Sequence, residues 1–156
     1  MSEEADRADT PVLPPLIPAC AVALGLLVHF LWPIEFLPAD AASVFGWLLL
    51  ATAFGIAGAA AWEMKSAKTN VHAHKPATNL VTGGPFAFSR NPIYLAMALA
   101  VVAIAGLLNS LWLLLLAGPT AFALQKFAIE PKERYLERKF GRGYLDDYKA
   151  RVGRWI

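Results

Sequence analysis

The residues best suited to chemistry stand where a polar segment meets a long apolar one. Gly83-Gly84-Pro85 is a turn signal. Asn91 precedes a proline and is disfavoured in helical geometry, whereas Pro92 suits the first turn of a helix. The sequence therefore places Arg90 and Asn91 at a helix start, with Tyr94 in the first turn. Free backbone N–H groups at a helix start attract anions, and the Arg90 guanidinium adds a fixed positive charge. This helix start is a candidate site for an anionic group.

A second polar segment, residues 126–156, carries many of the remaining ionisable side chains. An apolar stripe with four-residue spacing predicts an amphipathic helix here, and Gly141 is expected to cap a first short helix before a second one begins. The stripe consists of Leu136, Phe140, Tyr144, Tyr148 and Val152. From residue types alone, the simplest interpretation is a basic amphipathic anchor on a membrane surface, with its glutamates as surface charges.

Both polar segments belong to a strongly apolar chain. Of its 156 residues, 57% are hydrophobic and 17% are charged, whereas ordinary soluble domains have roughly 25% charged residues. A chain of this length cannot bury so much apolar surface in one core. The composition therefore indicates a membrane protein and excludes a disordered or collagen-like chain. The single cysteine, Cys20, excludes a disulfide framework and a multi-cysteine metal site.

Three uncharged stretches, residues 16–34, 41–62 and 93–124, supply the membrane helices. Each of the first two is close to the roughly 20 residues that a spanning helix needs. A single helix over the third would be about 48 Å long, which exceeds a hydrocarbon core of about 30 Å, and Gly106, Asn109 and Ser110 mark a turn at its midpoint.

We therefore expect an all-α integral membrane protein with about four transmembrane helices, of which the last two form a short hairpin. The expected transmembrane helices lie at about 16–36, 41–63, 92–108 and 110–129, and cytoplasmic amphipathic helices follow at about 131–141 and 143–152. Residues 1–15 are expected to form a disordered, acidic and proline-rich tail, and residues 16–156 a single domain.

The basic residues predict the orientation. All 14 Lys and Arg residues lie in the N-terminal tail, in the 63–92 connection or after residue 125, whereas the turns at the opposite end carry Glu35 and Asp40. The positive-inside rule then places both termini in the cytoplasm, most simply at a bacterial inner membrane. The small-residue stripe Ala51, Gly55 and Ala59 is expected to pack helices together.

Two motifs together resemble a known family. The first is Leu80-Val-Thr-x-Gly-Pro-Phe-x-x-Ser-Arg-Asn-Pro-x-Tyr94. After two membrane helices comes Glu133-Arg-x-Leu-x-x-x-Phe-Gly, with Tyr144, Tyr148, Val152 and Arg154 further along. In this order, over about residues 65–156, they resemble the isoprenylcysteine carboxyl methyltransferase family, which belongs with the integral-membrane phospholipid methyltransferases.

The resemblance implies methyl transfer from S-adenosyl-L-methionine to a lipophilic or membrane-embedded carboxylate, amine or thiol at the cytoplasmic face. It implies Arg90 and Glu133 as catalytic residues, and Arg151 and Arg154 as contacts for a substrate carboxylate or other anionic group. The implied cofactor-binding residues are Gly84, Pro85, Asn91, Pro92, Tyr94, Glu130, Glu133, Tyr144 and Tyr148. The expected partners are membrane lipid and a lipophilic substrate, without nucleic acid.

The chain departs from the family pattern at two places. The family often has His where Asn91 stands, and a Glu pair where Lys132-Glu133 stands, so one acidic contact is lost or is replaced by Glu130. A sulfonium donor is already activated, so the reaction mainly requires alignment of its partners rather than an acid–base pair or a metal. A carboxylate acceptor needs no base, whereas an amine or thiol would need one.

Two other functions fit part of the pattern. NADPH-dependent membrane reductases of the sterol or enone type share a C-terminal design of short helices, and a non-enzymatic scaffold would use basic helices only to bind anionic lipid. His29, near the middle of the first apolar stretch, is either functional or a neutral histidine bonded to a neighbouring helix. His72 and His74 lack partners for a metal site, so we expect no metal.

Overall fold

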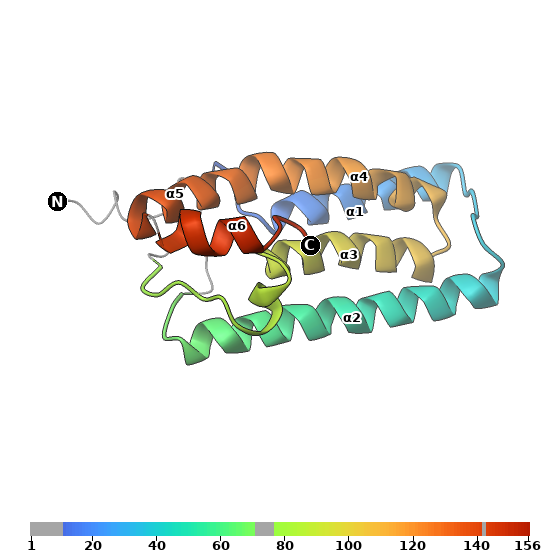
Figure 1. The fold of residues 1–156 in the computed structure, drawn as a ribbon. Coiled ribbons are helices and arrows are strands. Elements are labelled where there is room, and N and C mark those ends of the chain that lie inside the picture. Colours follow the sequence, from blue (N-terminus) through green and yellow to red (C-terminus); the bar gives the residue numbers. More distant parts are fainter. Residues whose placement is uncertain (1–10, 71–76, 142) are drawn as a thin grey trace.

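The computed structural model describes residues 11–70, 77–141 and 143–156, and in that part of the chain every regular element is helical (Figure 1). The prediction of an all-α fold is therefore confirmed for the described residues. The elements are α1 (Leu16–Leu31), α2 (Ala39–Ser66), the 3-10 turn η2 (Gly84–Ala87), α3 (Pro92–Leu107), α4 (Leu111–Leu124), the π turn η3 (Gln125–Ile129), α5 (Glu130–Phe140), the π turn η4 (Gly143–Tyr148) and α6 (Lys149–Arg151).

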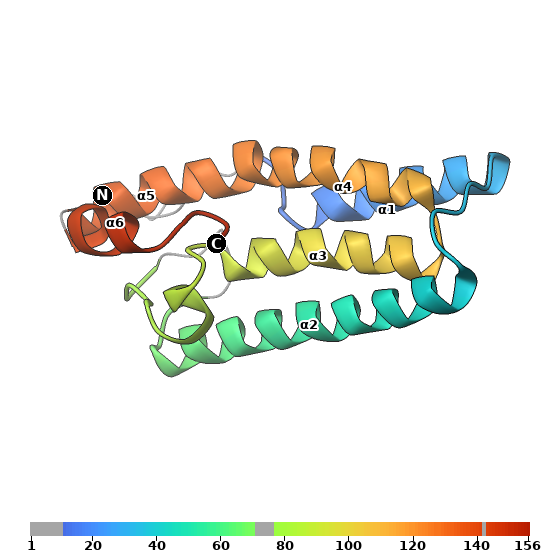
Figure 2. The same cartoon turned by 45° about the vertical axis from the view of Figure 1, so that its right-hand side comes forward.

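The four long helices form an elongated bundle in which α3 lies between α2 and α4 (Figures 1 and 2). Helix α1 packs mainly on α4 and less extensively on α3. The turns at 32–38 and 108–110 lie at one end of the bundle, and residues 77–91 lie with α5 and α6 at the other. The polar segments singled out from the sequence therefore gather at a single end.

Glycines set the close contact between α2 and α3. A Cβ atom on Gly46 would lie 2.5 Å from the Leu107 backbone nitrogen, and one on Gly106 would lie 2.9 Å from the Gly46 Cα atom. Ala53 and Ala60 continue the same face of α2 at seven-residue spacing, and both are buried. Small residues allow membrane helices to approach closely in this way.

The stripe of small residues that we predicted to pack helices together does not pack against another helix, so that prediction is wrong. Ala51, Gly55 and Ala59 are exposed, and a Cβ atom on Gly55 would meet nothing within 4 Å. Two faces of α2 have the same small-residue character, and α3 packs on the face that contains Gly46.

The fourth helix also differs from the expectation. A separate amphipathic helix was expected from about residue 131, but α4, η3 and α5 run on as one helix, Leu111–Phe140. Pro131 cannot donate a helical hydrogen bond and would crowd the carbonyl group four residues earlier. The π turn η3 ends two residues before Pro131, and such a wider turn accommodates a local break in the hydrogen-bond ladder.

Two helices, Ala39–Ser66 and Leu111–Phe140, are long and apolar enough to cross a membrane. Helices α1 and α3 have 16 residues each. Helix α1 is shorter than the predicted helix at about 16–36, because it ends at Leu31. Large apolar side chains cover the outer surface of the bundle, including Phe30 (80% exposed), Phe54 (72%) and Phe122 (63%). Contiguous apolar surface of this kind suits contact with lipid.

The turn predicted near residues 106–110 is confirmed. Asn109 has a positive φ of 47°, and its side-chain oxygen accepts hydrogen bonds from the Phe36 and Leu37 backbone N–H groups, each at 3.2 Å. The indole N–H of Trp112 donates to the carbonyl oxygen of Trp32 at 2.6 Å. The two turns at this end are thereby joined, which leaves the opposite end for the candidate site.

Candidate active site

The start of α3 is built as the sequence predicts. Asn91 is the non-helical residue before Pro92, with φ −134° and ψ 53°, and its backbone N–H donates to the Ser89 hydroxyl oxygen at 3.1 Å. Its side-chain amide donates to Glu133 Oε1 and to the carbonyl oxygen of Arg154, each at 3.2 Å. The helix start is thus linked to α5 and to the C-terminal residues.

Glu133 is the centre of a buried network that we call the ion cluster, formed by Arg90, Asn91, Glu133 and Arg154. Glu133 is 3% exposed. Its Oε1 lies 3.3 Å from Arg90 Nη1, and its Oε2 lies 2.9 Å from Arg154 Nη2 and accepts from Arg154 Nε at 3.1 Å. Buried charges are stable only when they are paired and hydrogen-bonded, and here one carboxylate serves two guanidinium groups.

The C-terminal residues cross the start of α3. The backbone N–H of Arg90 donates to the carbonyl oxygen of Gly153 at 3.0 Å. Trp155 donates its indole N–H to Gln125 Oε1 at 3.0 Å and packs on the buried cluster that contains Tyr94 and Ile129. The tail is therefore a structural part of the site, and Tyr94 lies buried beneath it.

Tyr144 and Tyr148 hold the C-terminal segment against η2. Their ring centroids are 5.9 Å apart in an edge-to-face arrangement, and both pack with Met64 and Phe86 in a second buried cluster. The Tyr148 hydroxyl donates to the carbonyl oxygen of Phe86 at 2.7 Å. Burial raises the pKa of Tyr144 to about 12 and the pKa of Tyr148 further, so both hydroxyl groups are neutral near pH 7.

Glu130 and Arg151, two charged residues implied by the family resemblance, lie outside the ion cluster. Glu130 pairs with Lys126 at 3.0 Å and lies 3.8 Å from Arg154 Nη1, and the hydrogen bond from Lys126 lowers the pKa of Glu130. Arg151 is exposed and donates to the carbonyl oxygen of Asp147 at 2.7 Å. The structure thus brings Arg154, but not Arg151, into the ion cluster.

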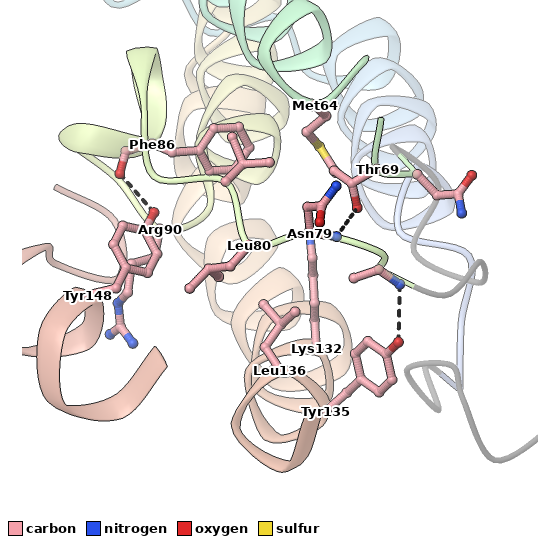
Figure 3. A pocket seen from close by; sticks show the side chains of 13 residues that line it. Met64, Thr69, Asn79, Leu80, Phe86, Arg90, Lys132, Tyr135, Leu136 and Tyr148 are labelled. Atoms are coloured by element: carbon pink, nitrogen blue, oxygen red, sulfur yellow. Dashed lines mark hydrogen bonds between the residues drawn. The ribbon is translucent and has the colours of Figure 1, made fainter. Parts of the chain in front are cut away.

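A pocket opens beside the ion cluster, between the end of α2, the 77–81 segment and α5 (Figure 3). We call it the polar pocket, and it is open to solvent. Of the residues implied by the resemblance, Arg90 and Tyr148 line it. The other lining residues are Met64, Thr69, Asn70, Ala77, Asn79, Leu80, Val81, Phe86, Lys132, Tyr135 and Leu136.

Sequence reasoning missed most of these lining residues. Two hydrogen bonds fold the 77–81 segment over the pocket: the Ala77 backbone N–H donates to the Tyr135 hydroxyl oxygen at 3.1 Å, and the Thr78 backbone N–H donates to Thr69 Oγ1 at 3.0 Å. Such contacts over long sequence distances leave no periodic signal. Lys132 was noticed only as a departure from the family pattern.

An apolar groove lies on the other side of η2. Its walls include Gly55 and Ala59 of α2 together with Phe88 and Leu95. Pro85 lines this groove, whereas its neighbour Phe86 lines the polar pocket. Because Gly84 has a φ of +55° and a Cβ atom there would lie 2.8 Å from Glu63 Cγ, the turn requires glycine. The 3-10 turn η2 therefore separates a polar site from an apolar one.

The fold and the site define an all-helical protein with an apolar exterior and a charged, partly enclosed site at one end. The sequence model of the phospholipid methyltransferase family matches residues 41–143. The chain belongs to this family of integral-membrane methyltransferases, which includes proteins like isoprenylcysteine carboxyl methyltransferase. Comparison of the chain with curated proteins finds no match, and comparison with solved structures finds none either. Family membership implies a membrane methyltransferase that acts on a lipid-related substrate.

One part of the polar pocket fits a carboxylate, a group that S-adenosyl-L-methionine carries, and the family generally uses this cofactor. The Arg90 side chain is 8% exposed. Its Nη1 atom is in the ion pair with Glu133, whereas its Nε atom has no hydrogen-bond partner in the described part of the chain. The Nε atom suits an anionic group such as a carboxylate. Thr69 and Asn79 offer polar atoms, and Leu80 and Phe86 offer apolar surface.

Of the three histidines, the structure describes His29. Residues 71–76, with His72 and His74, lie outside the described residues. The buried Nδ1 atom of His29 in α1 has no hydrogen-bond partner in the described part of the chain. Over the ranges 11–70, 77–141 and 143–156, no group of three or more His, Cys, Asp or Glu side chains could hold a metal ion.

Proposed function

We propose that this chain transfers a methyl group from S-adenosyl-L-methionine to a lipophilic or membrane-embedded acceptor at the cytoplasmic face of a membrane. The observation that carries the proposal is the convergence of three distant segments on Glu133. The start of α3, helix α5 and the C-terminal tail meet there through Asn91, Arg90 and Arg154, beside the polar pocket and at the end of the bundle where the basic segments gather.

When bound, the cofactor supplies an activated methyl group, so the protein must mainly hold and align the two reactants. In this proposal Arg90 holds the carboxylate of the cofactor, and the polar pocket encloses its remaining part. Glu133 acts as a positioning residue, because both of its oxygens already contact Arg90, Asn91 or Arg154. Tyr148 keeps η2 at the pocket wall through its bond to Phe86.

The apolar groove supplies a route for the acceptor. It runs along the outer face of α2, where Gly55 and Ala59 leave room beside α3, and it ends at Pro85, one residue from the wall of the polar pocket. A lipid chain in this groove would bring its head group to η2. The acceptor nucleophile is a carboxylate, an amine or a thiol.

The proposed topology has four spans with both termini in the cytoplasm. Helices α1 and α3, at about 24 Å each, are shorter than the hydrocarbon core, and they pack beside the longer α2 and α4. The turns at the far end carry Glu35 and Asp40 but no Lys or Arg, which suits the side away from the cytoplasm. The membrane in this proposal is a bacterial inner membrane.

Calorimetric titration of the detergent-purified protein with S-adenosyl-L-methionine tests the proposal. We expect micromolar binding, which Arg90→Gln weakens by about tenfold, the effect of losing one charge-assisted bond. Arg138→Gln is the matched control, because Arg138 is exposed on α5 and does not line the polar pocket.

Each alternative function predicts a different result. Binding of NADPH without binding of the methyl donor would indicate a reductase instead. Binding of anionic lipid that disappears with salt, with no cofactor bound, would indicate a scaffold. A folded sample that binds no methyl donor would overturn the proposed reaction.

A further inference from the structure

Lys132 is a cation in the wall of the polar pocket that has no ion-pair partner among the described residues. It extends from α5 toward Asn79 on the far side of the pocket (Figure 3). Its ammonium group makes no hydrogen bond or ion pair with another described residue. Its favourable contact is with the Tyr94 ring, whose centroid lies 5.4 Å from Nζ, and such cation–π contacts replace only part of the lost hydration.

The carboxylates of α5 do not neutralise this charge, because each is paired elsewhere. Glu130 pairs with Lys126, Glu133 with the two arginines of the ion cluster, and Glu137 with Lys149. The described residues that line the polar pocket include Lys132 and Arg90 but no Asp or Glu. Burial also lowers the pKa of Lys132 to about 8, as expected for an ammonium group with little solvent and no counter-charge.

We propose that Lys132 binds the anionic group, a carboxylate or a phosphate, of a ligand in the polar pocket. The inference rests on the proposed function, since that ligand is either the cofactor, through its carboxylate, or the acceptor, through an anionic head group. An anion at Lys132 supplies the counter-charge that the described residues of the pocket do not provide. The lysine stands where the family often has a glutamate, so this site has the opposite charge to the family pattern and selects for an anion.

Binding measurements with two pairs of probes test the proposal and identify the source of the anion. S-adenosylhomocysteine and 5′-methylthioadenosine share the adenosine and the sulfur, but only the first carries a carboxylate. Dodecyl phosphate and dodecanol share the chain, but only the first carries a phosphate. Each probe is titrated into the detergent-solubilised protein by calorimetry.

Lys132→Gln is expected to weaken the binding of one of the two anionic probes by about tenfold, as for the loss of a charge-assisted bond. The binding of the matching neutral probe should not change. Weaker S-adenosylhomocysteine binding assigns the anion to the cofactor, and weaker dodecyl phosphate binding assigns it to the acceptor. Lys132→Arg should retain affinity. Lys65→Gln, which removes an exposed charge at the end of α2 and outside the pocket, is the control.

The proposal is overturned if Lys132→Gln binds both anionic probes as tightly as the unmodified protein, or if Lys65→Gln weakens them equally. A failure of the proposed function gives a different result. Neither adenosine probe then binds the unmodified protein, while dodecyl phosphate still binds the unmodified protein more tightly than Lys132→Gln. Lys132→Met guards against a folding defect, because replacing an unpaired buried charge with an apolar side chain should not lower the melting temperature.

Discussion

Glu133→Gln is the substitution that most directly tests how the site is held together. The change keeps the size of the side chain and removes one negative charge from a group that is 3% exposed. Two guanidinium groups then lose the carboxylate between them. Arg154 keeps Glu130 at 3.8 Å, whereas Arg90, whose side chain is 8% exposed, has little access to water. Breaking a buried ion pair by removing one partner costs about 3–5 kcal/mol.

The expected loss of stability lies near the lower end of that range. Arg154 has a side chain that is 33% exposed, so water can solvate part of its charge after the substitution. A loss of about 3 kcal/mol corresponds to a fall in melting temperature of roughly 6–12 °C for a domain of this size. Thermal unfolding followed by circular dichroism in detergent measures it.

Glu137→Gln is the matched control for this experiment. It makes the same change on the same helix, but Glu137 pairs with Lys149 in a partly exposed position, where an ion pair contributes about 0–1 kcal/mol. The double variant Glu133→Gln/Arg154→Gln should recover part of the lost stability, since it removes one of the two unpaired cations. The reasoning is refuted if Glu133→Gln is no more destabilising than Glu137→Gln.

Three further predictions concern packing, the C-terminal tail and pH. Gly46→Leu should lower the melting temperature, because a Cβ atom there meets backbone at 2.5 Å and overpacking costs about 1–3 kcal/mol of stability or more. Gly55→Leu should leave the melting temperature nearly unchanged, because a Cβ atom there meets nothing within 4 Å. Deletion of residues 153–156 removes the bonds from the tail to Arg90, Asn91 and Glu133 and should abolish binding of the methyl donor, measured by calorimetry. Affinity for the anionic probe that responds to Lys132 should be full well below pH 8 and should fall as pH rises through about 8, where the free Lys132 ammonium loses its proton; Lys132→Arg should lose this fall over pH 7–9.

Local features of the fold were predictable because they depend on neighbouring residues. Pro92 after Asn91 marks the start of α3, and Gly141 caps α5 with a φ of +56°. The turn at Asn109 also follows from residue types, since asparagine adopts a positive φ more readily than most residues. Each of these predictions needs only a few consecutive residues and their backbone preferences.

The arrangement of the site was only partly predictable, since it depends on contacts between distant segments. The family resemblance implied that Asn91, Glu133 and Arg154 act at one site, and the structure brings them into contact across 42 and 63 residues. The resemblance did not indicate that both carboxylate oxygens of Glu133 would contact groups of the protein itself. Nor could periodicity choose between the faces of α2, because Gly46 and Gly55 look alike until their neighbours are known.

The ion cluster explains how so small a bundle keeps a polar site in place. Apolar contacts along α2 and α3 fix the helices but not their polar ends, whereas the bonds from Glu133 are directional and join α5 to two other segments. Because a single carboxylate faces two guanidinium groups, the cluster keeps an excess positive charge. Lys132, the preceding residue, adds a second charge on the side of the polar pocket. A pocket of this sign attracts anionic groups, so the charges of the protein favour a carboxylate or an anionic head group as the part of the ligand that lies against α5.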